Sequence, residues 1–292
     1  MKLKTINNMY EEVKPLQAVM FDILREAKRI CEKNDIKYFL AYGSLLGAVR
    51  HNGYIPWDDD VDICMQYSDF DKFRKACERD LGTDYFLQTP DKEPGGCHTY
   101  FKLRKNGTTL IVDSTVDADV HQGINIDIYP IYNMADNIIL RKVQLAFTAV
   151  FLLLSAGVSP KNHGGIMKWV SAAILKIFSS KFMKERVISI CQKQMAKYEN
   201  RKTIYKSLLF GNMDVCRLLY KSEWFDTSIQ HKFEDDMFSI PGGYDGFLKV
   251  RYGNYMELPP MEERGVKLQH VIKIDTEKDY KEYKGILYCK KG

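Results

Sequence analysis

The chain has 292 residues, of which 45% are hydrophobic and 28% charged, so it can bury the core of one large domain or two small ones. Its 43 basic and 38 acidic residues give a mild formal charge of +5. This charge suits an anionic substrate or membrane surface, but it lacks the clustering typical of nucleic-acid-binding proteins, so we expect no nucleic-acid partner.

Cysteine spacing and the N-terminal residues indicate a reduced, cytoplasmic protein. The seven cysteines are odd in number and widely scattered, and no two form a C-x-x-C pair. This pattern argues against a disulfide framework or a structural zinc site and favours buried thiols. Residues 1–14 lack the apolar core of a signal peptide, so we expect no secretion signal.

The first 50 residues predict one long helix, a strand and a short helix. Apolar residues recur every three or four positions from 10 to 33, which predicts an amphipathic helix. A short apolar run at 36–41 predicts a buried strand. The strand ends at a Gly-Ser dipeptide, and residues 45–50 follow as a brief helix.

Further strands are expected on both sides of another helix. A strand at 60–65 follows a Gly/Pro turn, and Ser68 is a suitable N-cap for the helix after it. Residues 99–112 surround an Asn-Gly dipeptide typical of tight turns, so we predict a hairpin there. Alternation of apolar and polar residues then predicts a strand at 124–129.

Beyond residue 135 the pattern becomes mainly helical. The stretch 143–160 contains no charged residue, and 166–186 mixes aliphatic residues and Trp169 with lysines. We expect helix to continue up to a Pro/Gly-rich tail that begins near residue 241. The predicted division is therefore an α/β catalytic core at 1–135 and a mainly helical region at 136–292.

Two carboxylates of the strand at 60–65 carry the main chemical signal. Asp60 and Asp62 would project from the same face, because side chains alternate along a strand. Carboxylates held together repel unless a cation lies between them, and Mg²⁺ or the similar Mn²⁺ takes oxygen ligands of this kind. The alternative is a solvated acidic loop. We favour the metal site.

Residues on either side complete the predicted site. Gly43 and Ser44, between a strand and a short helix, are expected to bind phosphate. Asp127, flanked by isoleucines, is the candidate third metal ligand; the alternative is a buried carboxylate paired with Arg or Lys. This order of elements predicts a nucleotidyltransferase-like mixed sheet. The predicted fold class is therefore α+β with a helical C-terminal region.

Four further side chains are candidates for substrate binding. Arg50 would neutralise charge on a leaving nucleotide, or lie exposed at a helix end. Lys102 and Arg104 share one strand face and would meet a diphosphate, unless that face is only solvated. Trp57, beside the acidic residues, would face a quaternary ammonium through a cation–π contact, or pack in the core.

Three segments resemble the LicD family, which includes phosphocholine transferases and relatives of the fukutin-type sugar-phosphate transferases. They are GSLLGAVRH at 43–51, IPWDDDVD at 55–62 and IDIYP at 126–130. Residues 251–260, with Arg264 and His270, resemble the C-terminal signature of that family. Asn254 departs from it, because the family often has Asp there, which argues against an ionic role at this position.

The resemblance implies transfer of phosphocholine, or a similar phospho-alcohol, from a CDP-activated donor to a sugar hydroxyl of a cell-surface glycan or teichoic acid precursor. It also implies that Asp60 and Asp62 hold Mg²⁺ against the donor diphosphate, while Asp127 completes the metal shell or accepts a proton. The alternatives are a true nucleotidyltransferase that releases pyrophosphate, and a non-catalytic membrane-associated binding protein.

The uncharged segment has two interpretations. Residues 143–160 are barely long enough to span a bilayer, which takes roughly 20 apolar residues, and they include polar side chains. With the basic stretch 166–186 they suit attachment to an anionic membrane surface near a lipid-linked glycan acceptor. The alternative is a helical pair buried against the catalytic domain. We expect peripheral attachment to the inner face of the cell membrane.

Overall fold

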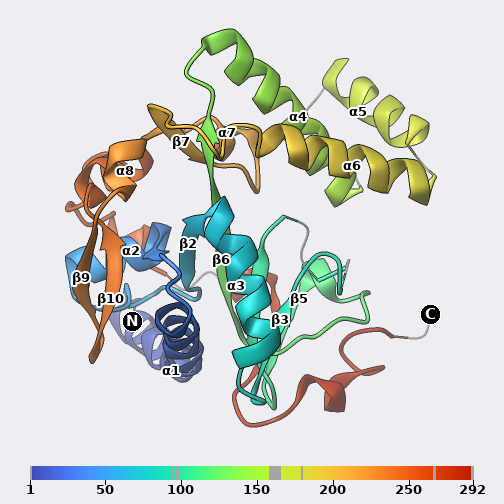
Figure 1. Ribbon diagram of the computed structural model, residues 1–292. Coiled ribbons are helices and arrows are strands. Elements are labelled where there is room, and N and C mark those ends of the chain that lie inside the picture. The colour runs from blue at the N-terminus through green and yellow to red at the C-terminus, as the bar shows by residue number, and fades with distance from the viewer. Residues whose placement is uncertain are drawn as a thin grey trace. The chain divides into compact units, whose positions relative to one another are not determined.

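A computed structural model describes residues 2–93, 95–96, 99–157, 166–178, 180–265 and 268–290. The chain forms two compact units, one of residues 1–129 and 224–292 and the other of residues 130–223 (Figure 1). The predicted α+β class is confirmed. The first boundary falls close to the predicted 135/136, but residues 224–292 belong to the first unit and not to the helical region.

The first unit is built on a sheet with the strand order β1-β2-β6-β4-β3. These strands are Phe39–Leu40 (β1), Asp62–Gln66 (β2), Asn125–Met134 (β6), Phe101–Lys105 (β4) and Tyr85–Gln88 (β3). β1 is antiparallel to β2, and β4 is antiparallel to β3 and β6. β2 and β6 are neighbours at the centre, where their side chains Ile63, Cys64, Ile126 and Ile128 are fully buried.

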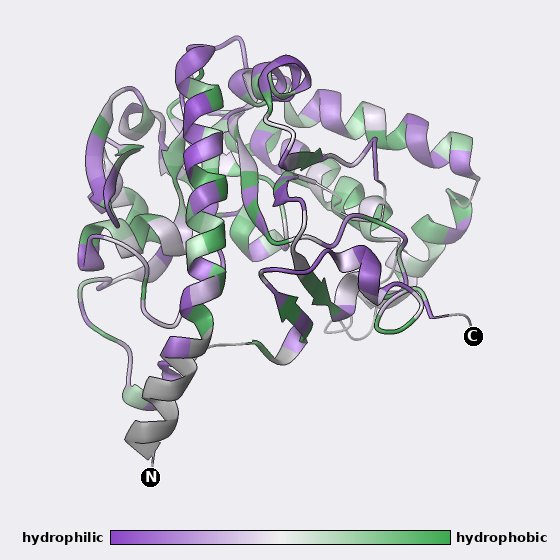
Figure 2. Ribbon diagram, turned by 90° about the horizontal axis from the view of Figure 1, so that it is seen from below, coloured by the Kyte–Doolittle hydropathy of each residue, from purple (hydrophilic) through white to green (hydrophobic). Residues whose placement is uncertain are grey.

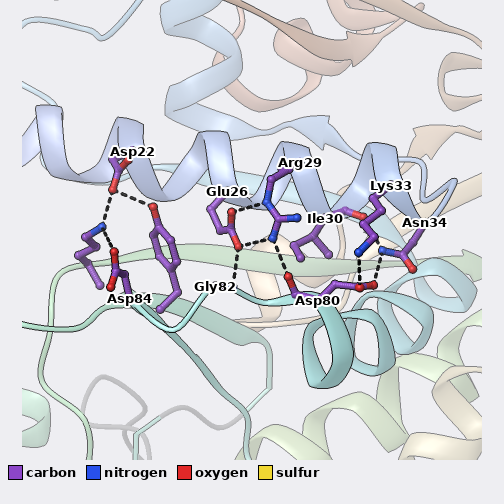
Figure 3. Close-up of polar contacts among 11 residues, drawn as sticks. Asp22, Glu26, Arg29, Ile30, Lys33, Asn34, Asp80, Gly82 and Asp84 are labelled. Carbon is purple, nitrogen blue, oxygen red and sulfur yellow. Dashed lines mark hydrogen bonds and ion pairs between the residues drawn. The ribbon is translucent and has the colours of Figure 1, made fainter.

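The long predicted N-terminal helix is present as α1 (Lys2–Lys33), and Figure 2 shows hydrophobic and hydrophilic residues alternating along it. Its buried positions include Leu16, Met20, Ile23, Ala27 and Ile30, which recur at helical spacing. On its polar side Glu26 pairs with Arg29 and accepts the Gly82 N–H, and Lys33 pairs with Asp80 (Figure 3). These contacts join α1 to the end of α3 (Tyr67–Asp80) and the segment before β3.

The short helix α2 (Tyr42–His51) begins earlier than predicted. Tyr42 starts it with a positive φ of 44°, and the Ala41 carbonyl accepts the Leu45 N–H at 3.0 Å. Gly43 and Ser44 therefore lie in the first turn of the helix, and not in a separate turn before it.

Residues 228–241 form a hairpin where helix was predicted, and a helix follows at 244–252, within the predicted Pro/Gly-rich tail. These elements are β9 (Ser228–Phe233), β10 (Asp236–Pro241) and α8 (Tyr244–Tyr252). Phe233 and Phe238 pack against Phe21 of α1. The hairpin is thus stabilised by a partner some 200 positions away along the chain, which local periodicity does not reveal.

The Asn106-Gly107 turn is present, but the predicted hairpin around it is not. Gly107 has a φ of 72°, as a tight turn requires. After the turn, β5 (Thr109–Val112) pairs with β11 (Val271–Asp275) from the C-terminal segment, while β4 lies between β3 and β6. β11, which is distant in the sequence, therefore pairs with β5 in place of the neighbouring strand β4.

The second unit begins with the helices α4 (Ile138–Ala156), α5 (Ile166–Ile177) and α6 (Lys181–Met195). The elements β7 (Tyr205–Leu208), α7 (Met213–Cys216) and β8 (Tyr220–Lys221) follow, and β7 pairs with residues 131–134 of β6. The predicted helical character therefore applies to residues 138–156, 166–177 and 181–195 and does not continue to the tail.

Six cysteines in the described part of the chain are free thiols, and all but Cys289 are buried. Cys97 and residues 158–165 of the predicted uncharged segment lie outside the described residues.

His121 is a neutral, buried histidine that links the sheet to the C-terminal segment. Its ring stacks on Phe86 at 5.0 Å and lies 4.5 Å from the ring of Tyr280, a residue of the short helix η5 (Tyr280–Tyr283). Nδ1 accepts the Gly123 N–H at 3.0 Å, so Nε2 carries the proton that is donated to Asn106 Oδ1 at 2.9 Å. Burial, reinforced by the charge of Arg104, lowers the pKa of His121 to about 3.

We expect His121 to make folding sensitive to acid. Its contribution is fully present above the ordinary histidine pKa of about 6.5 and is lost as the pH falls toward 3, because only the unfolded chain then binds a proton. In His121→Gln the free energy of unfolding should fall less steeply between pH 6.5 and 4, by up to about 1.4 kcal/mol per pH unit. Urea titrations at several pH values measure this, and parallel curves for the two proteins would contradict it.

Candidate active site

Asp62 is fixed by two hydrogen bonds to its backbone. Its carbonyl oxygen accepts the Ala41 N–H at 2.9 Å, and its own N–H donates to the Ser44 hydroxyl oxygen at 2.9 Å. Ser44 is buried in the first turn of α2. Its oxygen therefore holds the start of β2, a role that the sequence does not indicate and that differs from the predicted phosphate contact.

Asp58, Asp59 and Asp60 lie on the loop before β2, because the strand begins only at Asp62. Strand alternation therefore does not set the direction of the Asp60 side chain. Gly43 leaves space for this loop, since a Cβ on Gly43 would lie 2.6 Å from Asp58 Oδ2. The glycine thus allows the first turn of α2 to approach an acidic side chain closely.

The turn of the β9–β10 hairpin binds the start of the same loop. The Glu234 carboxylate accepts the Tyr54 N–H at 2.9 Å, and the Glu234 N–H donates to the Asn52 carbonyl at 2.9 Å. A side chain on Gly53 would overlap Glu234. The hairpin, which the sequence did not predict, is therefore part of the framework that positions the acidic loop.

Asp58, Asp59 and Asp60, which we call the acidic triad, offer carboxylate oxygens that lie within 4.8 Å of one another. Asp60 is exposed, and the other two are half-buried. Three oxygen ligands with one side open to water suit a hard divalent cation that keeps part of its hydration shell. Within the described residues this triad has metal-binding geometry. It shares only Asp60 with the predicted metal ligands Asp60, Asp62 and Asp127, and Asp58 and Asp59 were not among them.

Burial and repulsion make the carboxyls of Asp58 and of the neighbouring Asp62 costly to ionise. Burial raises the pKa of Asp58 well above its usual range, and the charges of Asp60 and Asp59 raise it further. Burial also raises the pKa of Asp62, with added repulsion from Asp60, Asp127 and Asp58. A cation bound among these groups would offset the repulsion.

The pKa of Asp60 is influenced by residues of other elements, which therefore face the same site. Loss of hydration and the charges of Asp59 and Asp127 raise the pKa of Asp60 to about 6, while Lys102 and His270 oppose this rise. Asp127 on β6, Lys102 on β4 and His270 near the C-terminus therefore all lie within electrostatic reach of the acidic triad.

Asp127 has a lysine partner but stays in the same acidic site. Its Oδ1 accepts Lys102 Nζ at 3.0 Å and Asn125 Nδ2 at 2.7 Å, and its Oδ2 accepts the Tyr129 hydroxyl at 3.1 Å. The Tyr129 hydroxyl also lies within hydrogen-bonding reach of Asp62. Asp127 thus matches the ion-paired alternative, while its charge acts on Asp60 and Asp62.

Arg104 is placed differently from the prediction. Its guanidinium is buried and donates to Gln88 Oε1 at 2.7 Å, to the Gly123 carbonyl at 2.5 Å and to Asn125 Oδ1 at 3.1 Å. This face of β4 is covered, and not solvated, at Arg104. We therefore assign Arg104 to the framework of the sheet and not to diphosphate binding.

Arg50 and Trp57 lie near the acidic loop. Arg50 donates to the Tyr255 carbonyl at 2.8 Å, which connects α2 to the segment after α8. Burial and the charge of Arg264 lower the pKa of Arg50, whereas Asp58 acts against this. Trp57 is half-buried and meets the His51 ring edge-on at 6.3 Å.

Two aromatic residues near the carboxylates, Tyr129 and Tyr252, were missed as site residues. The pKa of Tyr252 is raised by burial and by the charges of Asp62, Asp58 and Asp60, so this tyrosine at the end of α8 faces the same site. The signal that could have found them was the segments 126–130 and 251–260, quoted above for their resemblance and not for their chemistry.

We expect the charge on Asp58 to cost stability when no cation is present. When folding raises the pKa of an acid, the ionised acid destabilises the folded protein. The cost begins as the pH rises above about 4, the pKa in the unfolded chain, and is complete above the pKa in the folded protein. Asp58→Asn should therefore be more stable than the wild type by about 1–2 kcal/mol at pH 7 in EDTA, with the gain disappearing near pH 4. Thermal unfolding at both pH values tests this. A variant less stable than the wild type at pH 7 would contradict it.

Comparison with known proteins identifies related sequences. Residues 35–148 match the family described as "LicD/FKTN/FKRP, nucleotidyltransferase domain". The lipopolysaccharide cholinephosphotransferase LicD of Haemophilus influenzae is 27% identical over 263 residues, which cover 85% of this chain and 92% of that protein.

Two shorter matches cover 50 residues each. The human ribitol 5-phosphate transferase FKRP is 46% identical over 16% of this chain and 10% of its own length. The uncharacterized protein RP689 of Rickettsia prowazekii is 44% identical over 17% of this chain and 19% of its own length. The resemblance found in the sequence is confirmed: residues 35–148, which contain the acidic triad, β2 and Asp127, match the nucleotidyltransferase domain of the LicD/FKTN/FKRP family.

Proposed function

We propose that this chain is a metal-dependent transferase that moves phosphocholine, or a similar phospho-alcohol, from a CDP-activated donor to a sugar hydroxyl. The acceptor would be a cell-surface glycan or a teichoic acid precursor. The observation that carries the proposal is the acidic triad, in a chain that aligns with 92% of a cholinephosphotransferase. A protein that only binds a ligand has little need for carboxyls held at unfavourable pKa values.

The acidic triad would hold Mg²⁺ or Mn²⁺, which when bound would neutralise the donor diphosphate. Lys102 would supply a second positive charge, and its ion pair with Asp127 at 3.0 Å keeps its ammonium group beside the triad. The N–H groups in the first turn of α2, including that of Gly43, lack intrahelical partners and would donate to a phosphate oxygen. Such charge stabilisation is the main source of catalysis in phosphoryl transfer.

The bond changes are those of a single displacement. The sugar oxygen forms a bond to the phosphorus of the transferred group, the bond from that phosphorus to the CMP oxygen breaks, and CMP leaves with the electron pair. The hydroxyl proton would pass to a carboxylate of the site, with Asp127 as the candidate once it exchanges one of its hydrogen bonds. Arg50 would neutralise the leaving CMP, and Trp57 would face the quaternary ammonium of a choline group.

We place the reaction at the cytoplasmic face of the cell membrane. A CDP-activated donor is soluble, whereas a lipid-linked glycan acceptor is confined to the bilayer, so the two meet at this surface. A peripheral location would bring the enzyme to both substrates.

The released product separates this function from that of a true nucleotidyltransferase. With CDP-choline, CDP-ethanolamine, CDP-glycerol and CDP-ribitol offered in turn, we expect one donor to release CMP in a reaction that needs a divalent cation. Chromatography of the nucleotide products measures this. Pyrophosphate release from CTP, with no CMP from any of the four donors, would support the alternative and contradict the proposal.

We expect Asp60→Asn to remain folded and to lose about 10²- to 10³-fold in kcat, comparable to removing one electrostatic contact to a transition state. Excess EDTA should abolish wild-type activity. Asp214→Asn, which changes a highly exposed carboxylate of the second unit, is the matched control and should be unaffected.

Mg²⁺-induced thermal stabilisation distinguishes the two possible ligand sets without an activity assay. If the acidic triad holds the ion, Asp59→Asn should remove the stabilisation and Asp127→Asn should largely keep it. If Asp60, Asp62 and Asp127 hold it, the result is reversed.

A further inference from the structure

The helices of the second unit expose large apolar side chains. Of the 20 large hydrophobic residues recorded as exposed in the described part of the chain, ten lie between 138 and 190. Trp169 is 79% exposed, Phe182 70% and Ile177 62%; they lie on α5 and α6. We call these three side chains the apolar surface. Apolar side chains that gather in this way mark a surface that binds something.

The same helices carry the positive charge of the protein. Residues 138–195 contain nine basic residues and one acidic residue, a formal charge of +8, so the rest of the chain has a formal charge of −3. Among the described residues of these helices, the basic side chains without an ion-pair partner are Arg141, Lys142, Lys176, Lys181, Lys184, Arg186 and Lys193, and Arg141 lies over the ring of Tyr205. Along α1 and α3, by contrast, several lysines and arginines are paired with carboxylates. The cations of α4–α6 are therefore available to an anionic partner.

α4 is long and apolar enough to cross a membrane by length and composition alone. One of its faces, however, is committed to the protein, because Gln144, Thr148, Phe151 and Leu154 are buried. The Gln144 amide donates to the Asn133 carbonyl at 2.9 Å and to the Met195 carbonyl at 2.7 Å, and accepts the Ala135 N–H at 3.1 Å. A helix that crossed the bilayer alone would have to give up these bonds in a medium without replacements. The contacts favour a helix that lies along a surface.

We propose that the apolar surface and the unpaired cations of α4, α5 and α6 form a docking site for an anionic lipid bilayer, with Trp169, Ile177 and Phe182 inserting between lipids. Exposed aromatic and aliphatic side chains beside lysines are the composition of helices that lie in a membrane interface. A second copy of this chain would bring two sets of unpaired cations together and is disfavoured. This inference goes beyond the proposed reaction and does not depend on it.

Sedimentation with liposomes tests the site on the full chain. We expect binding to vesicles that contain phosphatidylglycerol, weak binding to pure phosphatidylcholine vesicles, and a decrease at high salt. Ile177→Ser should weaken binding at least tenfold through lost apolar contact. Lys176→Glu should weaken it by fivefold or more, since each cation near an anionic surface contributes about fivefold.

Matched variants in the first unit serve as controls. Ile286→Ser changes a side chain that is 63% exposed, close to the exposure of Ile177, and Lys232→Glu reverses an exposed lysine of β9. Both should bind like the wild type, and circular dichroism should show that all four variants are folded. The proposal fails if the four variants bind alike, if anionic lipid has no effect, or if Ile177→Ser instead abolishes a dimer seen by sedimentation. Resistance to alkaline extraction from membranes would show a spanning helix and would also overturn it.

Discussion

The repulsion among closely placed carboxylates is the constraint on which the organisation of the first unit depends. Asp58 and Asp62 resist ionisation through burial and through their acidic neighbours, so the folded chain holds them together at an energetic cost. Backbone contacts maintain the arrangement. The Ser44 hydroxyl anchors Asp62, and Gly43 makes room for Asp58. Such a strained acidic cluster is useful only when a cation or a cationic substrate group completes it, which is why it points to catalysis.

The protein already supplies part of the opposing charge. Lys102 is held against Asp127 by the register of β4 and β6, and both act electrostatically on Asp60. His270 adds a further favourable interaction from the C-terminal segment. Arg104, two residues along β4 from Lys102, performs a different task, because its guanidinium satisfies buried oxygen atoms at 88, 123 and 125. Lys102 and Arg104 share one face of β4, yet Lys102 belongs to the acidic site and Arg104 to the framework of the sheet, because Arg104 is buried.

The second unit is distinguished by apolar and basic side chains that are exposed to water. Gln144 ties α4 to backbone groups of its own unit, while many apolar residues of α4–α6 remain in water with unpaired cations beside them. An ordinary soluble helical unit would bury those side chains or replace them with polar ones. Exposed apolar side chains and unpaired cations together suit a partner that is apolar inside and anionic at its surface. An anionic membrane has both properties.

The sequence by itself determined the α+β class, the amphipathic helix α1 and the apolar strands β2 and β6, and it selected Asp60, Asp62 and Asp127 as candidate site residues. These rest on local periodicity and on carboxylate chemistry, which a short window of sequence contains. Tertiary structure alone decided that Asp60 lies on a loop, that Asp59 joins the triad, that Ser44 faces a backbone N–H, and that β5 pairs with β11 and not with β4. It also decided that residues 224–292 complete the first unit, where the turn of β9–β10 supports the acidic loop. In each case the deciding partner lies far away along the chain, and the free energy of such a contact depends on packing and burial that no local pattern encodes.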